Sequence, residues 1–294
     1  MTTNSSDRWS YIFFSAPALL IYSLVIIAPV LYSVILSFTA WSGSGTPQFN
    51  GLENYQALLG APEFRHALYN NALIILVSVF VQIPLGFVLS WIIYRKLVRG
   101  GSFFQSVIFL PVVISPVVIG LLFQAFFGVG GVLEAVIADL RNQPLFLLTS
   151  FSGKYTAIIP VLTVLVWMFS GLYMVIFLAN LQKISPEMLE AAQIEGASEL
   201  QIMLQIAVPG MVPVFVTSII YAISGSLKSF DLVWVMTNGG PSFYTEVLAS
   251  YMFKSTFQFY NYGYGAAITV VIVLLSVVLI QFLLVLVRRY QPDS

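Results

Sequence analysis

The chain has 294 residues, of which 59% are hydrophobic and only 8% are charged, and its formal net charge is zero. Soluble domains carry about 25% charged residues, so this composition predicts an integral membrane protein. Zero net charge provides no basic surface for nucleic acid. The absence of cysteine excludes disulfides, thiolate metal sites and cysteine nucleophiles, and a single histidine, His66, excludes a multi-histidine metal site within the chain.

Six long windows of the sequence contain no Asp, Glu, Lys or Arg. A membrane-spanning helix needs roughly 20 apolar residues, so each window is long enough to hold one. The first apolar block is too long for a signal peptide and lacks its cleavage site, so we expect it to be retained. The fold class predicted is an all-α integral membrane protein with one transmembrane domain over residues 1–294. The six spans are expected near residues 11–38, 68–94, 104–127, 156–181, 207–229 and 263–287.

Prolines interrupt several of these windows. Residues 111–116 begin and end with proline inside the third window, and Pro209 and Pro213 lie near the start of the fifth span. In lipid, such breaks occur where neighbouring helices or water satisfy the freed backbone carbonyls. The third span is therefore expected to bend, either towards a cavity or as a simple packing kink. Glycines within residues 128–131 are expected to end it.

The distribution of positive charge predicts the orientation of the spans. Seven Lys or Arg residues fall on the face that carries the N terminus and four on the opposite face, when Lys228 at the end of the fifth span is left out. Both termini are therefore expected in the cytoplasm, with residues 39–66, 128–155 and 230–260 outside. The seven are Arg8, Arg95, Lys96, Arg99, Lys183, Arg288 and Arg289, and the four are Arg65, Arg141, Lys154 and Lys254.

No catalytic or nucleotide-binding motif is recognisable in the sequence. The pair Gly153-Lys154 lacks the spacing and the hydroxyl of a P-loop, and no zinc-protease or serine-hydrolase signature is present. No Asp or Glu lies at mid-membrane depth, which argues against a proton-coupled pump but not against sodium sites made of carbonyls. We therefore expect no catalytic residue, no metal and no cofactor. Any ligand should be recognised by neutral polar groups and aromatic rings.

Residues 186–195 are predicted to form a short helix on the cytoplasmic side, and after a turn a second helix is expected to run towards Pro209. Ser185 is a good N-cap with proline after it, and Gly196 can adopt the left-handed conformation that ends a helix. Ser198 can cap the second helix, with Gln201 at its third position. The segment carries four acids and only one nearby base, so anionic lipid would repel it and docking into a partner protein is favoured. The acids are Glu187, Glu190, Glu195 and Glu199.

At these residues the chain resembles the membrane subunits of ABC importers. Their cytoplasmic loop reads Glu-Ala-Ala, two residues, an acid, Gly-Ala, and later Ile-x-Leu-Pro. Here Glu195 is the acid, and Val208 replaces the leucine. The resemblance implies a type I ABC importer permease fold, in which loop 183–206 carries a coupling helix that docks on an ATPase subunit. The positions that match the docking motif are Glu190, Ala191, Ala192, Glu195, Gly196 and Ala197.

A second element narrows the resemblance to carbohydrate-type permeases. Residues 228–241 contain Phe-Asp followed by Thr-Asn-Gly-Gly-Pro, which is similar to the larger membrane subunit of the maltose importer and to glycerol-phosphate importer permeases. The resemblance covers essentially the whole chain, without the large external insertion of the maltose subunit. Asn238 should begin a sharp turn. Four residues near the expected outer mouth are candidates for the substrate path, namely Phe230, Asp231, Trp234 and Asn238. For Asp231, an ion pair with Lys228 or a helix cap is the alternative.

The resemblance implies one membrane subunit of an ATP-driven importer, forming half of a translocation pathway. Its expected partners are a second homologous permease subunit, two ATP-binding cassette subunits, an extracytoplasmic solute-binding protein and the lipid of a bacterial or archaeal inner membrane. The expected cargo is a sugar, specifically an oligosaccharide, and the few positive charges that face the spans disfavour an anionic cargo. Glycerol-3-phosphate or a glycerophosphodiester is the alternative within the family. A stand-alone carrier or channel is the alternative from another class.

Overall fold

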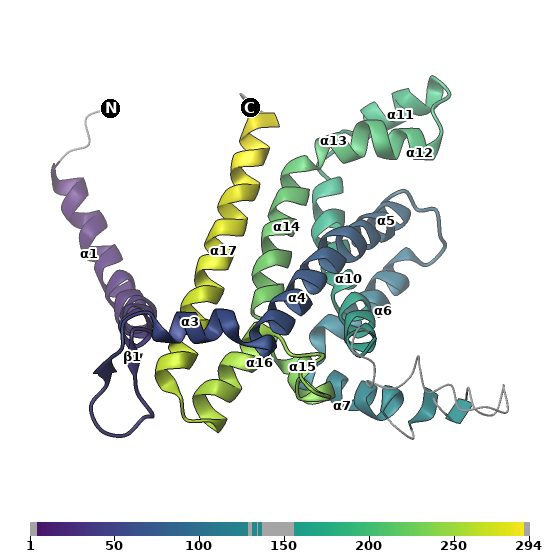
Figure 1. Ribbon diagram of the computed structural model, residues 1–294. Helices are drawn as coiled ribbons and strands as arrows, with labels where there is room; N and C mark the ends of the chain where they lie inside the picture. The colour runs from purple at the N-terminus through teal and green to yellow at the C-terminus, as the bar shows by residue number, and fades with distance from the viewer. Residues whose placement is uncertain (1–4, 129–130, 134, 137–155, 291–294) are drawn as a thin grey trace. The chain divides into compact units, whose positions relative to one another are not determined.

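The chain divides into two compact units, and Figure 1 shows the helices that form them. The smaller unit comprises residues 1–61 and 252–273, and the larger comprises residues 62–251 and 274–294. The computed structural model describes residues 5–128, 131–133, 135–136 and 156–290, and only the backbone of residues 5–13 and 289–290. Most of the outer loop expected at 128–155 therefore lies outside the described residues.

The second and fourth predicted spans are continuous helices of the larger unit. The second runs from Pro62 to Tyr94, and the fourth is α10 (Ile159–Leu181). Both end at the predicted residue, whereas the second begins six residues early because proline and an acid in its first turn favour a helix start there. Its parts are α4 (Pro62–Val77), the π-helical turn η2 (Ser78–Gln82) and α5 (Ile83–Tyr94).

The third predicted span is a pair of helices rather than one. α6 (Gly101–Val113) and α7 (Pro116–Phe127) meet at an angle of 94°. Ile114 and Ser115 between them are extended, because proline at position 116 disfavours helical geometry in the residue before it. The bend was predicted at this proline run, but the single helix expected over 104–127 is absent from the described chain. After the bend, α7 packs along α15 (Asp231–Thr237).

The fifth predicted span also begins with a sharp bend. The helix from Glu199 to Gly210 meets α14 (Val212–Leu227) at 71°. Among the described residues, four helices are long and apolar enough to cross a membrane, and the number is six if each bent pair counts as one span. The short elements before α14 are α11 (Pro186–Ile194), α12 (Glu199–Ile202), η3 (Met203–Ala207) and α13 (Val208–Gly210).

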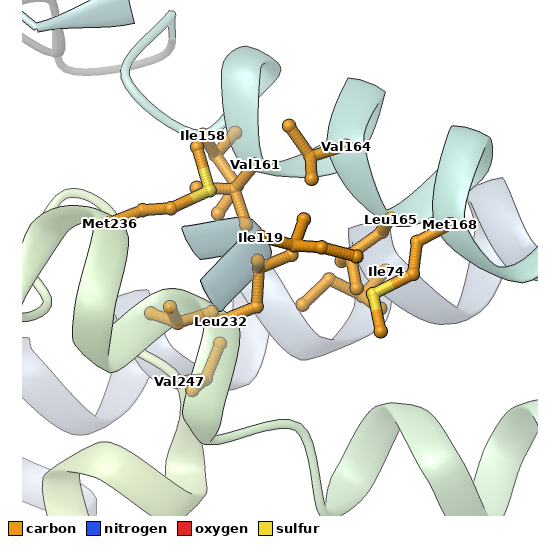
Figure 2. Packing of buried hydrophobic residues seen from close by; sticks show 11 residues of the cluster. Ile74, Ile119, Ile158, Val161, Val164, Leu165, Met168, Leu232, Met236 and Val247 are labelled. Atoms are coloured by element: carbon orange, nitrogen blue, oxygen red, sulfur yellow. The ribbon is translucent and has the colours of Figure 1, made fainter. Parts of the chain in front are cut away.

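A core of apolar side chains holds α7, α10 and α15 together. Figure 2 shows Ile119 of α7 with Val161 of α10 on one side and Leu232 of α15 on the other. Helices in lipid gain little from removing apolar surface from water, so close van der Waals packing of these side chains holds the contact. The α7 segment is therefore fixed to the same body as α10. The whole cluster comprises Ile74, Ile119, Ile158, Val161, Val164, Leu165, Met168, Leu232, Val233, Met236 and Val247.

The smaller unit contains the first predicted span and the beginning of the last. The apolar stretch Phe14–Leu36 is only 6% buried in the structure, as expected for a helix that faces lipid or another protein. Beyond it, the Asn54 amide donates hydrogen bonds to the carbonyls of Ser37 and Thr39, which fastens the following loop. The elements are α1 (Ser5–Tyr22), η1 (Ser23–Ile27), α2 (Ala28–Leu36), the antiparallel strands β1 (Thr39–Ala40) and β2 (Gln48–Phe49), and α3 (Glu53–Gly60). Three elements follow α15 later in the chain, α16 (Leu248–Phe253), η4 (Lys254–Gln258) and α17 (Tyr262–Tyr290).

Candidate functional site

The helix α11 is the predicted docking helix of loop 183–206. Ser185 caps it, since its hydroxyl oxygen accepts a hydrogen bond from the Met188 N–H at 3.4 Å. The Ser185 hydroxyl also donates to Glu187 and thereby holds the pKa of that carboxyl below its usual value. Leu189 is 2% exposed and packs against the ends of α5 and α10. In Figure 1, α11 and α12 lie beyond the end of α14 that is opposite to α15.

The helix α11 ends in a Schellman motif. Gly196 has φ of +84° and donates its N–H to the carbonyl of Gln193, and Ala197 donates to the carbonyl of Ala192, both at 3.0 Å. This pair of bonds defines the motif and requires the left-handed conformation that glycine adopts most easily. Ala192 and Ala197 also pack against the same core as Leu189. The prediction that Gly196 ends the helix is confirmed, and the spacing of the alanines has a structural explanation.

The outer face of this loop is apolar and acidic. Met188, Ile194 and Leu200 are 53%, 88% and 60% exposed. Glu190, Ala191 and Glu195, which the docking motif singled out, are also exposed. Exposed apolar side chains of this size, ringed by charge, are typical of a surface that meets another protein. The four exposed members of the motif are Glu190, Ala191, Glu195 and Gly196.

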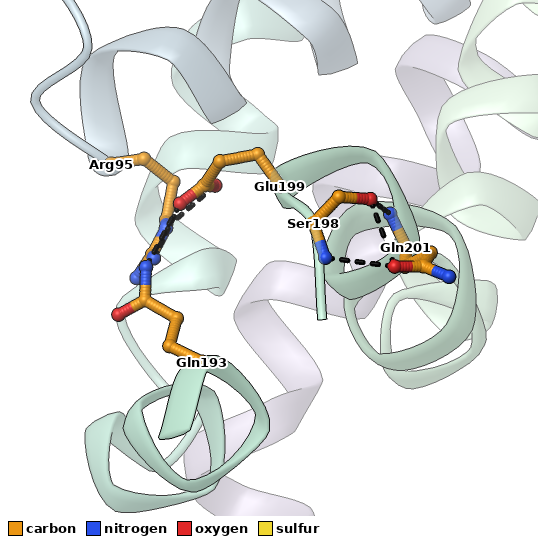
Figure 3. A network of polar contacts seen from close by, with 5 residues as sticks. All are labelled: Arg95, Gln193, Ser198, Glu199 and Gln201. Atoms are coloured by element: carbon orange, nitrogen blue, oxygen red, sulfur yellow. Dashed lines mark hydrogen bonds and ion pairs between the residues drawn. The ribbon is translucent and has the colours of Figure 1, made fainter. Parts of the chain in front are cut away.

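The second predicted helix of the loop begins as expected. Ser198 and Gln201 form a reciprocal capping box at the start of α12 (Figure 3). Next to it lies an ion pair that sequence reasoning missed. Arg95 donates to both carboxylate oxygens of Glu199, from Nε at 3.0 Å and from Nη2 at 2.7 Å. Gln193 of α11 donates to the same carboxylate at 3.1 Å.

The Arg95–Glu199 pair is ionised at neutral pH. The hydrogen bond from Arg95 holds the pKa of Glu199 below its usual value, and the same bond raises the pKa of Arg95. Both groups lie outside the charge-free windows. A planar guanidinium that engages both oxygens fixes orientation as well as distance. The carboxylate therefore connects the end of α5 with both helices of the loop.

A cavity of about 230 Å³ lies among α4, η2, α10, α14 and α15. Four polar residues on its wall, Ser78, Gln82, Tyr173 and Ser226, are at most 5% exposed. None of these four side chains makes a hydrogen bond within the part of the chain that the structure describes. By contrast, Ser90 of α5 bonds back to a carbonyl of its own helix. The cavity wall thus presents hydroxyl and amide groups that have no partner inside the described protein.

The structure brings two of the four predicted substrate-path residues to this cavity. Phe230 and Asp231 lie on its wall, and Trp234 stacks on Phe230 with ring centroids 5.3 Å apart. Asn238 is not part of the wall; its φ of +50° ends α15 and begins the predicted sharp turn. Asp231 occupies the first turn of α15, where a negative charge is favourable, and no ion pair joins it to Lys228 in the described structure.

Two adjacent asparagines in the second span support the cavity wall. Asn71 donates its amide to the carbonyl of Ser226 at 2.7 Å and accepts the N–H of Leu248 at 2.8 Å. Asn70 donates to the carbonyls of Tyr244 and Glu246. These bonds join α4 to the end of α14 and to the turn after α15. Two adjacent amides in a charge-free window could have indicated these bonds from the sequence, since buried polar groups in membrane helices need partners.

Comparison with solved structures shows that this fold occurs in a chain of an ABC transporter. It matches a chain in a crystal structure of a bacterial alginate ABC transporter in complex with alginate pentasaccharide-bound periplasmic protein. The TM-score is 0.84, the identity is 18%, and the match covers 98% of this chain and 97% of that chain. This likeness shows the fold, which is the type I permease fold predicted from the sequence.

Sequence comparison shows the family. The model of the binding-protein-dependent transport system inner membrane component matches residues 82–292. The lactose transport system permease protein LacF of Rhizobium radiobacter is 30% identical over 84% of this chain and 83% of its own length. The alpha-glucoside transport system permease protein AglF of Rhizobium meliloti is 34% identical over 87% of this chain and 74% of its own length. The chain belongs to the family of binding-protein-dependent transport system inner membrane components.

Proposed function

We propose that this chain is a permease subunit that forms half of the translocation pathway of an ATP-driven importer for an oligosaccharide. Its two compact units constitute one permease domain in the inner membrane, with both termini in the cytoplasm. A second homologous permease completes the pathway, an external solute-binding protein delivers the sugar, and two ATP-binding cassette subunits supply the energy. The lactose and alpha-glucoside systems of its relatives support a sugar as cargo.

The cavity is the observation that carries the choice of cargo. A buried hydrogen-bonding group without a partner costs about 1–3 kcal/mol. Ser78, Gln82, Tyr173 and Ser226 line the cavity without a side-chain partner inside the described protein, so a ligand that displaces water from them must supply hydrogen bonds of its own. The hydroxyls of a sugar can satisfy such groups, and the ring of Phe230 on the same wall can contact the apolar C–H face of the sugar. A polyhydroxylated ligand therefore fits this wall better than an apolar one.

The charges of the wall favour a neutral sugar over a glycerol phosphate. Lys228 and Asp231 both line the cavity, and their formal charges cancel. Phosphate recognition usually relies on Arg or Lys groups or helix N-termini that leave a local excess of positive charge. The charged side chains of this wall provide no such excess.

The exposed face of α11 supports the ATPase-docking role of loop 183–206. Met188 and Ile194 of α11, with Leu200 of the neighbouring α12, present apolar surface, and Leu189 of α11 is buried against the larger unit. A rigid helix with an apolar face is suited to insertion into a groove of another protein. The docking residues proposed remain Glu190, Ala191, Ala192, Glu195, Gly196 and Ala197.

Substitutions in the cavity test this function. We expect Gln82→Leu and Ser78→Ala each to lower uptake of lactose or maltotriose about 2- to 10-fold in proteoliposomes that hold the complete importer, at saturating loaded binding protein. This range corresponds to the 0.5–1.5 kcal/mol of a typical hydrogen bond. The matched control is Ser90→Ala, because Ser90 bonds to the Phe87 carbonyl and is not part of the cavity wall.

Two results would contradict the proposal. If Gln82→Leu and Ser78→Ala transport sugar as fast as the wild type, the cavity is not on the sugar path. If the wild-type importer takes up glycerol-3-phosphate and neither neutral sugar, the cargo is the phosphorylated alternative.

A further inference from the structure

The Arg95–Glu199 ion pair lies where the second span meets the docking loop. The two residues are 104 positions apart in the sequence, and their side chains are 14% and 36% exposed. The Arg95 guanidinium also lies 5.7 Å from the centre of the Trp91 ring, which limits its freedom to reorient. Partly exposed ion pairs contribute little to stability. This geometry instead fixes the orientation of the docking loop relative to the end of the second span.

On one side, the pair holds the docking loop as a unit. Glu199 is the first residue of α12 and also accepts a hydrogen bond from Gln193 of α11, as Figure 3 shows. Leu189 of α11 and Ile202 of α12 are buried in one apolar cluster with the end of α5. The carboxylate therefore bonds to both α11 and the residue that directly follows α5.

On the other side, the helices that begin or end at the two residues lead to the cavity. Arg95 directly follows α5, and α5 runs without a break into η2, which carries Ser78 and Gln82 on the cavity wall. From Glu199, the chain continues through η3 and α13 to the 71° bend and into α14, which carries Ser226. Two walls of the cavity are thus connected at one ion pair.

We infer that Arg95 and Glu199 are positioning residues that make loop 183–206 and the second span move as one body, so that a displacement of the loop reaches Ser78 and Gln82 in the cavity. This inference rests on the proposed docking of an ATPase at the loop. Apolar contacts alone permit two helices to slide, whereas a guanidinium that engages both carboxylate oxygens constrains distance and angle together. Loss of the pair should therefore leave the ATPase bound and reduce the transmission of its movement.

The test is a double-mutant cycle in the reconstituted importer, with the number of sugars transported per ATP hydrolysed as the readout. We expect Arg95→Gln and Glu199→Gln each to lower this ratio at least about fivefold, while the ATPase subunits copurify as with the wild type. Because both changes remove one interaction, the double variant should be no worse than either single one. Arg99→Gln is the control, since it removes an exposed arginine four residues away.

A second variant keeps the test valid if a glutamine variant does not fold. Arg95→Lys retains the charge and loses the forked geometry, so its ratio should stay below that of the wild type at an unchanged melting temperature. Unchanged ratios in both single glutamine variants, or losses that add in the double variant, would overturn the inference. Failure of the wild-type complex to bind an ATPase would instead refute the proposed function, and the two failures are therefore distinguishable.

Discussion

Substitutions at Gly196 should impair coupled uptake least for asparagine, more for alanine and most for valine. The backbone at Gly196 has φ of +84°, and no atom lies within 4 Å of the position that a Cβ would occupy. Space is therefore available for a side chain, and only the backbone conformation selects glycine. A left-handed conformation costs an ordinary residue about 1–2 kcal/mol, asparagine less, and a β-branched residue more. For alanine this penalty corresponds to roughly a 5- to 30-fold loss of the Schellman geometry relative to competing conformations.

The assay for this series is copurification of the ATPase subunits together with ATP-dependent sugar uptake in proteoliposomes. Asparagine should retain most of the activity and valine the least. Gly210→Ala is the control, because Gly210 is helical and has equally open surroundings without a positive φ. Equal losses for all three substitutions would refute the reasoning, since they would show that the ATPase requires empty space at this position rather than a particular backbone shape.

Two further predictions concern packing in the larger unit, with the melting temperature of the purified complex as the measurement. A Cβ at Gly171 would lie 2.2 Å from the Ile108 carbonyl oxygen, so Gly171→Ala should force the helices about 1 Å apart and destabilise the unit by about 1–3 kcal/mol. Gly101→Ala, where a methyl group fits, is the control, and equal melting temperatures would contradict this account. Asn71→Leu should destabilise by about 2 kcal/mol or more, because it leaves the buried Leu248 N–H without its acceptor, and an unchanged melting temperature would show that this bond contributes nothing.

The docking loop could be predicted from sequence because its signals are local. Ser185, the following proline and Gly196 act within a few residues of where they stand, through capping and left-handed backbone geometry. The structure places the helix at residues 186–194, against a predicted 186–195. The ends of the second and fourth spans could be predicted equally well, since a change from apolar to charged residues marks them.

The remaining features depend on contacts between distant parts of the chain. Residues 111–116 indicated a bend, but the angle of 94° reflects the packing of α7 on α15, which apolar composition does not encode. Arg95 and Glu199 each resemble a solvated loop charge when considered alone. Gln82 is a single amide in an apolar window, and only its position beside Ser226 in the folded chain makes it part of a cavity wall.

The measurement that tests the central claim most directly is sugar uptake by proteoliposomes that contain this chain with its partner permease, the two ATPase subunits and the external binding protein. The account predicts uptake of a neutral oligosaccharide that requires ATP and the binding protein together and is lost when either is omitted. Uptake by this chain alone, in the absence of nucleotide, would contradict it.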